Sequence, residues 1–188
     1  MKYTQHSIAG RAKQNEDRVL VSELTPAKLL AVMADGMGGL DNGERASEIA
    51  VNEIEAFLRS NNDDNTYEDT FSRVIQTADD AIAKEAFEKG LKMGCAIAVA
   101  IIENGQLHCI SLGNIHILLN DKLITADDVY VDSLGGTYLT KSLRGRGIPQ
   151  PLQVIHCELK SGWHVRICSD GFYNNDESDD ASVIDIME

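Results

Sequence analysis

The chain has 188 residues, of which 43% are apolar and 25% charged, a composition typical of soluble globular proteins. Its net charge of −13 argues against a nucleic-acid backbone or an anionic membrane as the main partner. No segment approaches the roughly 20 apolar residues of a membrane-spanning helix, and the amino terminus lacks the apolar run of a signal peptide. We expect one compact domain over residues 1–188, without a C-terminal extension.

The four cysteines lie within apolar, strand-like segments, and no two of them form a Cys-x-x-Cys pair. They are Cys95, Cys109, Cys157 and Cys168. This pattern is typical of buried, reduced thiols, which persist in a reducing compartment. We therefore expect a cytoplasmic protein.

Apolar runs predict strands before and after a central helical region. The first strands are predicted at Lys2–Ile8, Arg18–Glu23 and Leu29–Ala34. The later ones are predicted at Cys95–Glu103, Gln106–Leu112, Ile115–Asn120, Leu152–Leu159, Trp163–Ser169 and Ser182–Met187. Turn signals at Glu103-Asn104-Gly105 and Asn120-Asp121 predict hairpins, so much of the strand pairing should be antiparallel.

Two helices are predicted between the third and fourth strands, because Gly43–Ser60 and Thr66–Lys89 each carry an apolar stripe at helical spacing. Strands, then two adjacent helices, then many strands indicate an α+β fold rather than alternating β-α-β units. Residues Asp127–Gly147 show few strand signals and are predicted to form the longest irregular loop. Long loops of this kind are often functional.

Two apolar strands run directly into Asp-Gly, at Asp35-Gly36 and at Asp170-Gly171. A carboxylate at the end of a buried strand needs water or a cation, and glycine lets another group approach the backbone closely. One such corner would be an ordinary turn. Two corners and a further acidic cluster, Asp179-Asp180, indicate carboxylates gathered around divalent metal ions.

The ordered set of motifs resembles the metal-dependent serine/threonine protein phosphatases of type 2C, also called the PPM family, in a compact bacterial form. The segments that carry the resemblance are Gly10–Asp17, Asp35–Gly39, Gly43–Ser47, Met93–Ala96, Leu112–Asn114, Leu139–Leu143, Ser169–Phe172 and Asp179–Val183. They span nearly the whole chain in the family's order. The resemblance implies a four-layer αββα sandwich, in which helices flank two mainly antiparallel sheets and a binuclear metal site lies at the edge.

The resemblance also implies the ligands of two Mn²⁺ or Mg²⁺ ions. They would be the carboxylates of Asp35, Asp170 and Asp179, the backbone carbonyl of Gly36, and either Glu16 or Asp17. Asp35 would bridge both ions. Hard divalent cations prefer such oxygen ligands, and two ions about 3.5–4 Å apart can hold a hydroxide in line with a phosphorus atom. The implied reaction needs no protein nucleophile.

Two asparagines depart from the family pattern at its third, weaker metal site. Asn114 and Asn174 occupy positions where the family usually has aspartate. An asparagine still offers a carbonyl oxygen but lacks the charge that attracts a weakly held cation. We therefore predict two tightly bound ions and a third that is absent or weak.

The phosphate-binding arginine of the family is displaced. Its usual position holds Ala12, which is flanked by Arg11 and Lys13. We predict that Arg11 binds phosphate, because a guanidinium can grip phosphate with two parallel hydrogen bonds, and keep Lys13 as the alternative. Only eight residues separate Asp170 from Asp179, and little sequence is available for the flap that borders the site in larger bacterial members. We expect no flap subdomain.

The expected protein is a phosphatase that hydrolyses phosphoserine and phosphothreonine monoesters through a metal-bridging hydroxide, with Asp35, Asp170 and Arg11 as catalytic residues. Its partner would be a phosphorylated protein in a signalling system, where it opposes a serine/threonine kinase and acts as a monomer. Two alternatives stay open. One is a pseudophosphatase that serves as a regulatory or binding module, and the other is a phosphatase for a different phosphorylated substrate.

Overall fold

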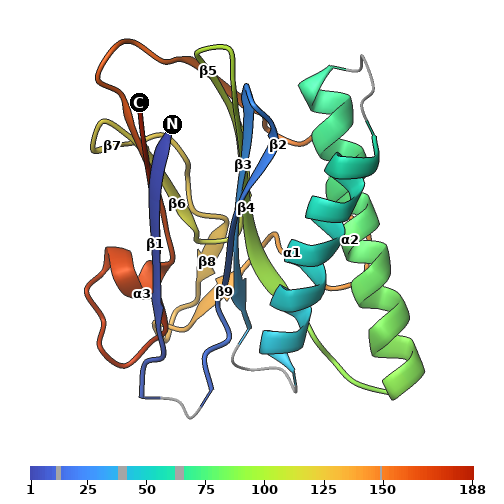
Figure 1. The fold of residues 1–188 in the computed structure, drawn as a ribbon. Coiled ribbons are helices and arrows are strands. Elements are labelled where there is room, and N and C mark those ends of the chain that lie inside the picture. The colour runs from blue at the N-terminus through green and yellow to red at the C-terminus, as the bar shows by residue number, and fades with distance from the viewer. Residues whose placement is uncertain (12–13, 38–41, 62–65, 149) are drawn as a thin grey trace.

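Two β-sheets pack face to face, and two long helices cover the outer face of one of them (Figure 1). The computed structural model describes residues 1–11, 14–37, 42–61, 66–148 and 150–188. The helices are α1 (Gly43–Ser60) and α2 (Tyr67–Lys89), and a single turn, α3 (Asp170–Tyr173), lies beside the other sheet. The expected α+β class with two large antiparallel sheets is confirmed.

The sheet next to α1 and α2 has the strand order β10-β5-β4-β3-β2. Its strands are β10 (Ile155–Glu158), β5 (Gln106–Leu112), β4 (Cys95–Glu103), β3 (Lys28–Gly36) and β2 (Arg18–Thr25). The central strands β3 and β4 are buried along almost their whole length, because the helices cover one face and the second sheet covers the other. This explains why both strands read as continuous apolar runs in the sequence.

The second sheet has the strand order β1-β12-β11-β6-β7. Its strands are β1 (Lys2–Ile8), β12 (Ala181–Met187), β11 (His164–Cys168), β6 (His116–Leu119) and β7 (Lys122–Leu123). β1 pairs with β12 from Lys2 opposite Met187 to Ile8 opposite Ala181, so the two ends of the described chain lie side by side (Figure 1). Every strand pair among the described residues is antiparallel.

The apolar core has two parts. The first lies between the helices and the β2–β5 sheet and contains Phe71, Ile54 and Ile97, none of which is exposed. The second lies between the two sheets and contains residues such as Ile167 and Ile184. Successive side chains of β3 and β4 point to opposite faces of their sheet, so these two strands contribute residues to both parts of the core.

The outer helical layer of the expected four-layer sandwich is reduced on one side. Among the described residues, α3 is the only helix beside the β1–β12 sheet, and it is four residues long. The segment that could form longer helices there, between Asp170 and Asp179, has only eight residues. β1 is accordingly exposed along its whole length.

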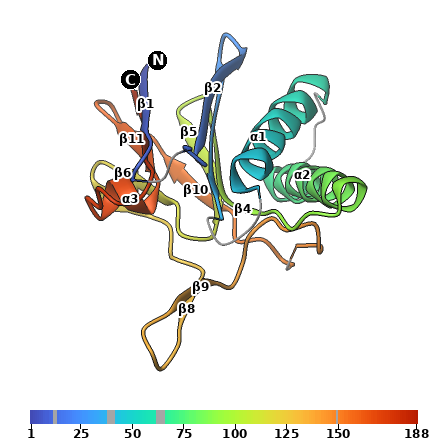
Figure 2. The ribbon, with the colours of Figure 1, turned by 90° about the horizontal axis from the view of Figure 1, so that it is seen from below.

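The segment expected as a long irregular loop contains a hairpin. Strands β8 (Val129–Val131) and β9 (Thr137–Leu139) pair there and project from the body of the molecule (Figure 2). The Asp132 side chain closes the turn by accepting hydrogen bonds from the backbone N–H groups of Leu134 and Gly136, both at 2.8 Å. The prediction missed these strands because each is only three residues long.

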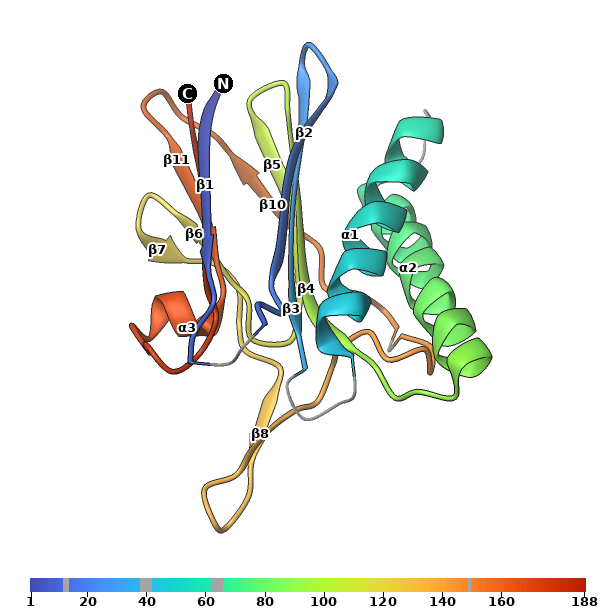
Figure 3. The same ribbon diagram turned by 60° about the horizontal axis from the view of Figure 1, so that its bottom comes forward.

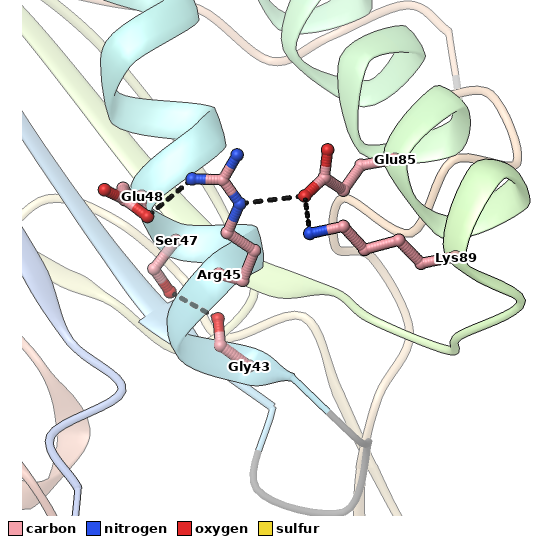
Figure 4. Close-up of polar contacts among 6 residues, drawn as sticks. All are labelled: Gly43, Arg45, Ser47, Glu48, Glu85 and Lys89. Carbon is pink, nitrogen blue, oxygen red and sulfur yellow. Dashed lines mark hydrogen bonds and ion pairs between the residues drawn. The ribbon is translucent and has the colours of Figure 1, made fainter.

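The two long helices are tied together near the start of α1. The Arg45 guanidinium donates to Glu48 at 2.7 Å and to Glu85 of α2 at 3.0 Å, and Lys89 contacts the same Glu85 oxygen at 2.7 Å (Figure 4). Surface ion pairs of this kind contribute at most about 1 kcal/mol each. They join the start of α1 to the last turns of α2, and α1 itself starts at Gly43 beside the end of β3.

All four cysteines are free thiols, and three of them are buried, as the sequence predicted. The fourth, Cys157, is partly buried. None of the helices in the described ranges combines the length and the apolarity that crossing a membrane would require.

Replacing Phe71 by alanine should destabilise the fold, because its ring is fully buried between α2 and the sheet. We expect Phe71→Ala to lower the free energy of unfolding by about 3–5 kcal/mol, measured by urea denaturation. Phe87, on the same helix, is 89% exposed and provides the matched control. Phe87→Ala should change stability by less than about 0.5 kcal/mol, and equal effects of the two substitutions would contradict this packing.

Candidate metal centre

The start of α1, α3 and the β8–β9 hairpin lie at the same end of the sandwich (Figure 3). Asp35 lies at the end of β3, and Asp170 begins α3. A pocket of about 550 Å³ opens there. Its lining includes Asp35 and Gly36 from the end of β3, Asp170 from the start of α3, and Asp179 from the segment before β12. Residues that are more than 140 positions apart in the chain therefore share one cavity.

Close backbone approach explains the glycine of the first corner. A Cβ on Gly36 would lie 2.5 Å from the backbone carbon of Gly43 and 2.7 Å from the Cβ of Glu16. The Gly36 N–H donates to the Glu16 carbonyl at 3.2 Å. The glycines thus let the end of β3, the start of α1 and the segment before β2 come together beside the pocket.

A second contact of this kind holds the Asp179 segment. A Cβ on Gly171 would lie 2.3 Å from the carbonyl oxygen of Asp180, so α3 packs directly on this backbone. The buried Asp180 carboxylate accepts from the N–H groups of Gly10 at 2.8 Å and Glu16 at 2.7 Å. Sequence reasoning assigned no role to Asp180. Its position beside Asp179 was the available signal, and its role is to clamp the segments that carry the other acids.

Asp17 is the most deeply buried of the predicted ligands, with 2% of its surface exposed. Neither of its carboxylate oxygens has a hydrogen-bond partner within the described part of the chain. The hydroxyls of Ser169 and Ser182 lie nearby but donate to the Asp180 carbonyl and to Ser7. Burial, opposed in part by these two hydroxyls, raises the pKa of Asp17 to about 6.

The other acids are electrostatically coupled to Asp17 and to one another. Burial raises the pKa of Asp35 well above its ordinary value, and the charges of Asp17, Asp170 and Asp179 raise it further. Burial and neighbouring carboxylates also raise the pKa values of Glu16 and Asp179. Each of these groups would be stabilised in its charged form by a nearby cation.

The donor set fits divalent cations in its chemistry. Carboxylate oxygens and a backbone carbonyl are the ligands that Mg²⁺ and Mn²⁺ prefer, and the orphaned oxygens of Asp17 are free to coordinate. As they stand in the described ranges, no three His, Cys, Asp or Glu side chains are arranged around a common point as an ion would require. Side-chain rotation toward an ion would therefore accompany binding.

The two asparagines of the predicted third site lie close to Asp170. The Asn114 amide donates to the Asp170 Oδ2 at 2.6 Å, and the Asn114 Oδ1 is buried without a partner among the described residues. Asn174 ends α3, where its backbone N–H donates to the Asp170 carbonyl at 2.8 Å. An amide donor on Asp170 occupies one carboxylate oxygen that could otherwise face a cation.

The predicted phosphate-binding residues are not part of the pocket lining in the described structure. Arg11 is exposed, its backbone N–H donates to the Ser178 carbonyl at 3.3 Å, and its charge helps to lower the pKa of Asp176. Lys13 lies outside the described residues. Arg144, which the sequence analysis did not single out, lines the pocket instead.

The comparisons with known proteins establish the family. A profile described as protein phosphatase 2C matches residues 4–188, and the chain therefore belongs to this family. This confirms the resemblance and the expected enzyme class, a metal-dependent protein serine/threonine phosphatase. A comparison with curated protein sequences gave no match.

Solved structures of bacterial phosphatases share the fold. The serine/threonine phosphatase PstP/Ppp of Mycobacterium tuberculosis matches with a TM-score of 0.80 and 20% identity, over 98% of this chain and 97% of that chain. The catalytic domain of PstP in complex with two manganese ions gives 0.78 and 21%, over 98% and 96%. Stp1 from Staphylococcus aureus gives 0.86 and 16%, over 100% and 94%. At these identities the likeness establishes the fold.

Asp17→Asn should remove the free-energy cost of burying a charged carboxylate in the metal-free protein. The pKa of Asp17 is raised from 3.8 to about 6 in the folded state, so its stabilising contribution is complete below pH 3.8 and is lost as the pH rises through about 6. Relative to the wild type, Asp17→Asn should gain roughly 2–3 kcal/mol in free energy of unfolding between about pH 4 and pH 7.

Urea denaturation in the presence of a chelator, repeated at each pH, measures this difference. Groups that titrate equally in both proteins cancel in the comparison. A stability difference that stays constant over the whole pH range would show that Asp17 is not held in a desolvated state.

Proposed function

We propose that this phosphatase hydrolyses phosphoserine and phosphothreonine monoesters with two divalent cations held by Asp35, Gly36, Asp170 and Asp179, together with Glu16 or Asp17. The observation that carries the proposal is the shared pocket, in which Asp35, Gly36, Asp170 and Asp179 all line one cavity. The raised pKa values of Asp35, Asp17 and Asp179 support it, because neighbouring acids of like charge favour a bound cation.

Each residue has a distinct part in this proposal. The charges of both Asp17 and Asp170 raise the pKa of Asp35, so its carboxylate lies near both, which suits a ligand shared by two ions. The hydrogen bond from the Gly36 N–H to the Glu16 backbone carbonyl holds the end of β3 beside the segment that carries Glu16 and Asp17. When bound, two cations lower the pKa of a water molecule between them and offset the charge of the phosphate. The protein's own task is to position these ligands.

Attack by a protein thiol is a poor alternative for this pocket. Cys95 lies near enough to Asp35 for the carboxylate charge to affect it, but it is fully buried. Burial first, and then the charges of Asp35 and Asp79, raise the pKa of this thiol far above its ordinary value. Cys95 therefore stays protonated, whereas nucleophilic catalysis by cysteine needs the thiolate.

The cellular setting follows from the family and from the composition. We propose that the substrate is a phosphorylated protein, that the enzyme opposes a serine/threonine kinase, and that it acts as a monomer in the cytoplasm of a bacterium. The buried free thiols and the net charge of −13 support a reducing compartment and a partner other than nucleic acid or membrane. Residues 1–188 would act as one domain without a flap subdomain.

Removal of either corner carboxylate should abolish catalysis. We expect Asp35→Asn and Asp170→Asn to lower the Mn²⁺-dependent hydrolysis of a phosphothreonine peptide at least about 100-fold, because each loses a charge that holds a cation. The control is Glu177→Gln, an exposed acid of the same segment that does not line this pocket. Its rate should match the wild type.

Three outcomes would contradict the proposal. Activity that survives both corner substitutions would remove the assigned ligands. A wild-type protein that binds no Mn²⁺ at micromolar concentration would favour the pseudophosphatase, for which the loss of acids at Asn114 and Asn174 is the motive. If aryl phosphates are hydrolysed but phosphopeptides are not, the substrate is a different phosphorylated molecule.

The number of bound ions tests the role of the two asparagines. We expect calorimetric titration to give two Mn²⁺ per wild-type chain. The double variant Asn114→Asp/Asn174→Asp should add a third, weaker ion, because it restores two carboxylates beside Asp170. Asn114→Asp/Asn175→Asp is the matched control and should add none. A wild-type titration with three ions would contradict the predicted loss of the site.

A further inference from the structure

Arg144 brings a positive charge to a pocket whose other charged lining residues are acids. Its side chain lines the same cavity as Asp35, Asp170 and Asp179. These acids, together with Glu16 or Asp17, carry at least as much negative charge as two divalent cations carry positive charge. A phosphate dianion entering such a site would meet acids as well as cations, so a further positive charge would favour its binding.

The backbone of Arg144 is fixed by a buried carboxylate. Asp79, which is 1% exposed on α2, accepts at Oδ1 from the N–H groups of Arg144 at 2.8 Å and Gly145 at 2.7 Å. Its Oδ2 accepts from the Gly147 N–H at 2.8 Å. Three charge-assisted hydrogen bonds from one carboxylate hold this loop to the helix.

The residues beside Arg144 are adapted to this anchorage. Gly145 has φ +67°, and a Cβ there would lie 2.5 Å from the Cα of Ala83, so the loop lies directly on α2. On the other side, Leu143 exchanges two backbone hydrogen bonds with Cys95, at 2.9 and 3.0 Å. Arg144 is therefore held between α2 and the start of β4, on well-packed elements rather than on a free loop.

The stem of the Arg144 side chain runs over a glycine toward the metal corner. A Cβ on Gly94 would lie 3.0 Å from the Arg144 Cγ and 3.2 Å from the sulfur of Met37, the residue after Gly36. The Met37 N–H donates to the Gly94 carbonyl at 3.0 Å. Gly94 thus leaves room for the arginine to lie against the segment that carries Asp35.

The guanidinium keeps donors available for a ligand. Its Nε donates to the Ser142 hydroxyl at 2.6 Å, and its Nη2 donates to the Leu139 carbonyl at 3.2 Å. Both acceptors are neutral, and among the residues with described positions none forms an ion pair with Arg144. By contrast, Arg45 is paired with two glutamates (Figure 4).

We propose that Arg144, positioned by Asp79, is the residue that binds the phosphate of the substrate in this pocket. The proposal rests on the phosphatase function proposed above. It replaces the expected role of Arg11, whose exposed side chain lies on the side of Asp176 and Ser178. A guanidinium suits this role because two parallel N–H groups match two phosphate oxygens.

The direct test is equilibrium binding of inorganic phosphate to the Mn²⁺-loaded protein, measured by calorimetry. Arg144→Met keeps the length of the side chain and removes the charge, and it should weaken phosphate binding about tenfold or more. Arg144→Lys should recover part of this loss. Mn²⁺ affinity should be unchanged in both. Arg146→Met is the matched control, since Arg146 is exposed in the same loop and does not line the pocket.

Asp79 acts through Arg144, and a double-mutant cycle distinguishes this from a general loss of stability. Asp79→Asn removes the charge that anchors the loop, so it should also weaken phosphate binding and raise KM for phosphopeptide more than it lowers kcat. In a protein that already carries Arg144→Met, Asp79→Asn should have little further effect on phosphate binding. Additive effects of the two substitutions would overturn the positioning role.

The outcomes separate this inference from the phosphatase function. If the wild type hydrolyses phosphopeptide but Arg144→Met binds phosphate as well as the wild type, the inference fails and the phosphatase function stands. If Arg11→Met alone loses phosphate binding, the role belongs to Arg11. If the wild type binds phosphate through Arg144 without hydrolysing phosphopeptide, the inference stands and the function fails. A wild type that binds no phosphate overturns the inference.

Discussion

Mutual repulsion among neighbouring carboxylates is the physical constraint on which the pocket end of the molecule depends. The charges of Asp17, Asp170 and Asp179 repel that of Asp35 and raise its pKa. Burial of Asp35 removes much of the water that would screen this repulsion. A free carboxylate under these conditions takes up a proton, as the raised pKa of Asp17, to about 6, indicates. Divalent cations offer the alternative of keeping the acids charged. The site is therefore built to favour protons or metal ions over an empty, ionised state.

The scaffold holds the acids together through backbone contacts that do not depend on the ions. Asp180 clamps the N–H groups of Gly10 and Glu16, and Gly36 packs directly on Gly43. The apolar core on both sides of β3 and β4 fixes the strand that ends at Asp35. The free energy gained from packing and hydrogen bonding thus opposes the electrostatic repulsion among the acids. This is a common arrangement at functional sites.

The positively charged Arg144 is likewise held in place by contacts within the protein. Asp79 is a buried carboxylate on α2 whose oxygens are satisfied by backbone N–H groups and not by a cation. Within the described part of the chain, the guanidinium of Arg144 has neutral acceptors only. In the proposed enzyme, one set of acids attracts metal ions, while a different acid holds the arginine that receives the phosphate. Although Arg144 lines the same pocket as the proposed metal ligands, none of them forms an ion pair with it among the described residues.

The sequence predicted the elements with strong periodicity and the residues at their ends. The bounds of α1, β4 and β5 agree with the predicted ranges, because long apolar patterns specify them. The two Asp-Gly corners were recognisable because a buried strand precedes each. Asp79 and Arg144 were not recognisable, because their contact joins a helix to a loop 65 positions later and no local pattern encodes it. The hairpin of β8 and β9 was too short for periodicity to reveal.

Counting the protons that are released when metal binds tests the central claim most directly. Calorimetric titration of Mn²⁺ into the protein at about pH 6, in buffers that differ in ionisation enthalpy, counts the protons displaced from the acids. If cations replace protons on Asp17 and Asp35, binding at pH 6 should release protons, and the share from Asp17, whose pKa is about 6, should fall as the pH rises above that value. Mn²⁺ binding without proton release at pH 6 would contradict the account.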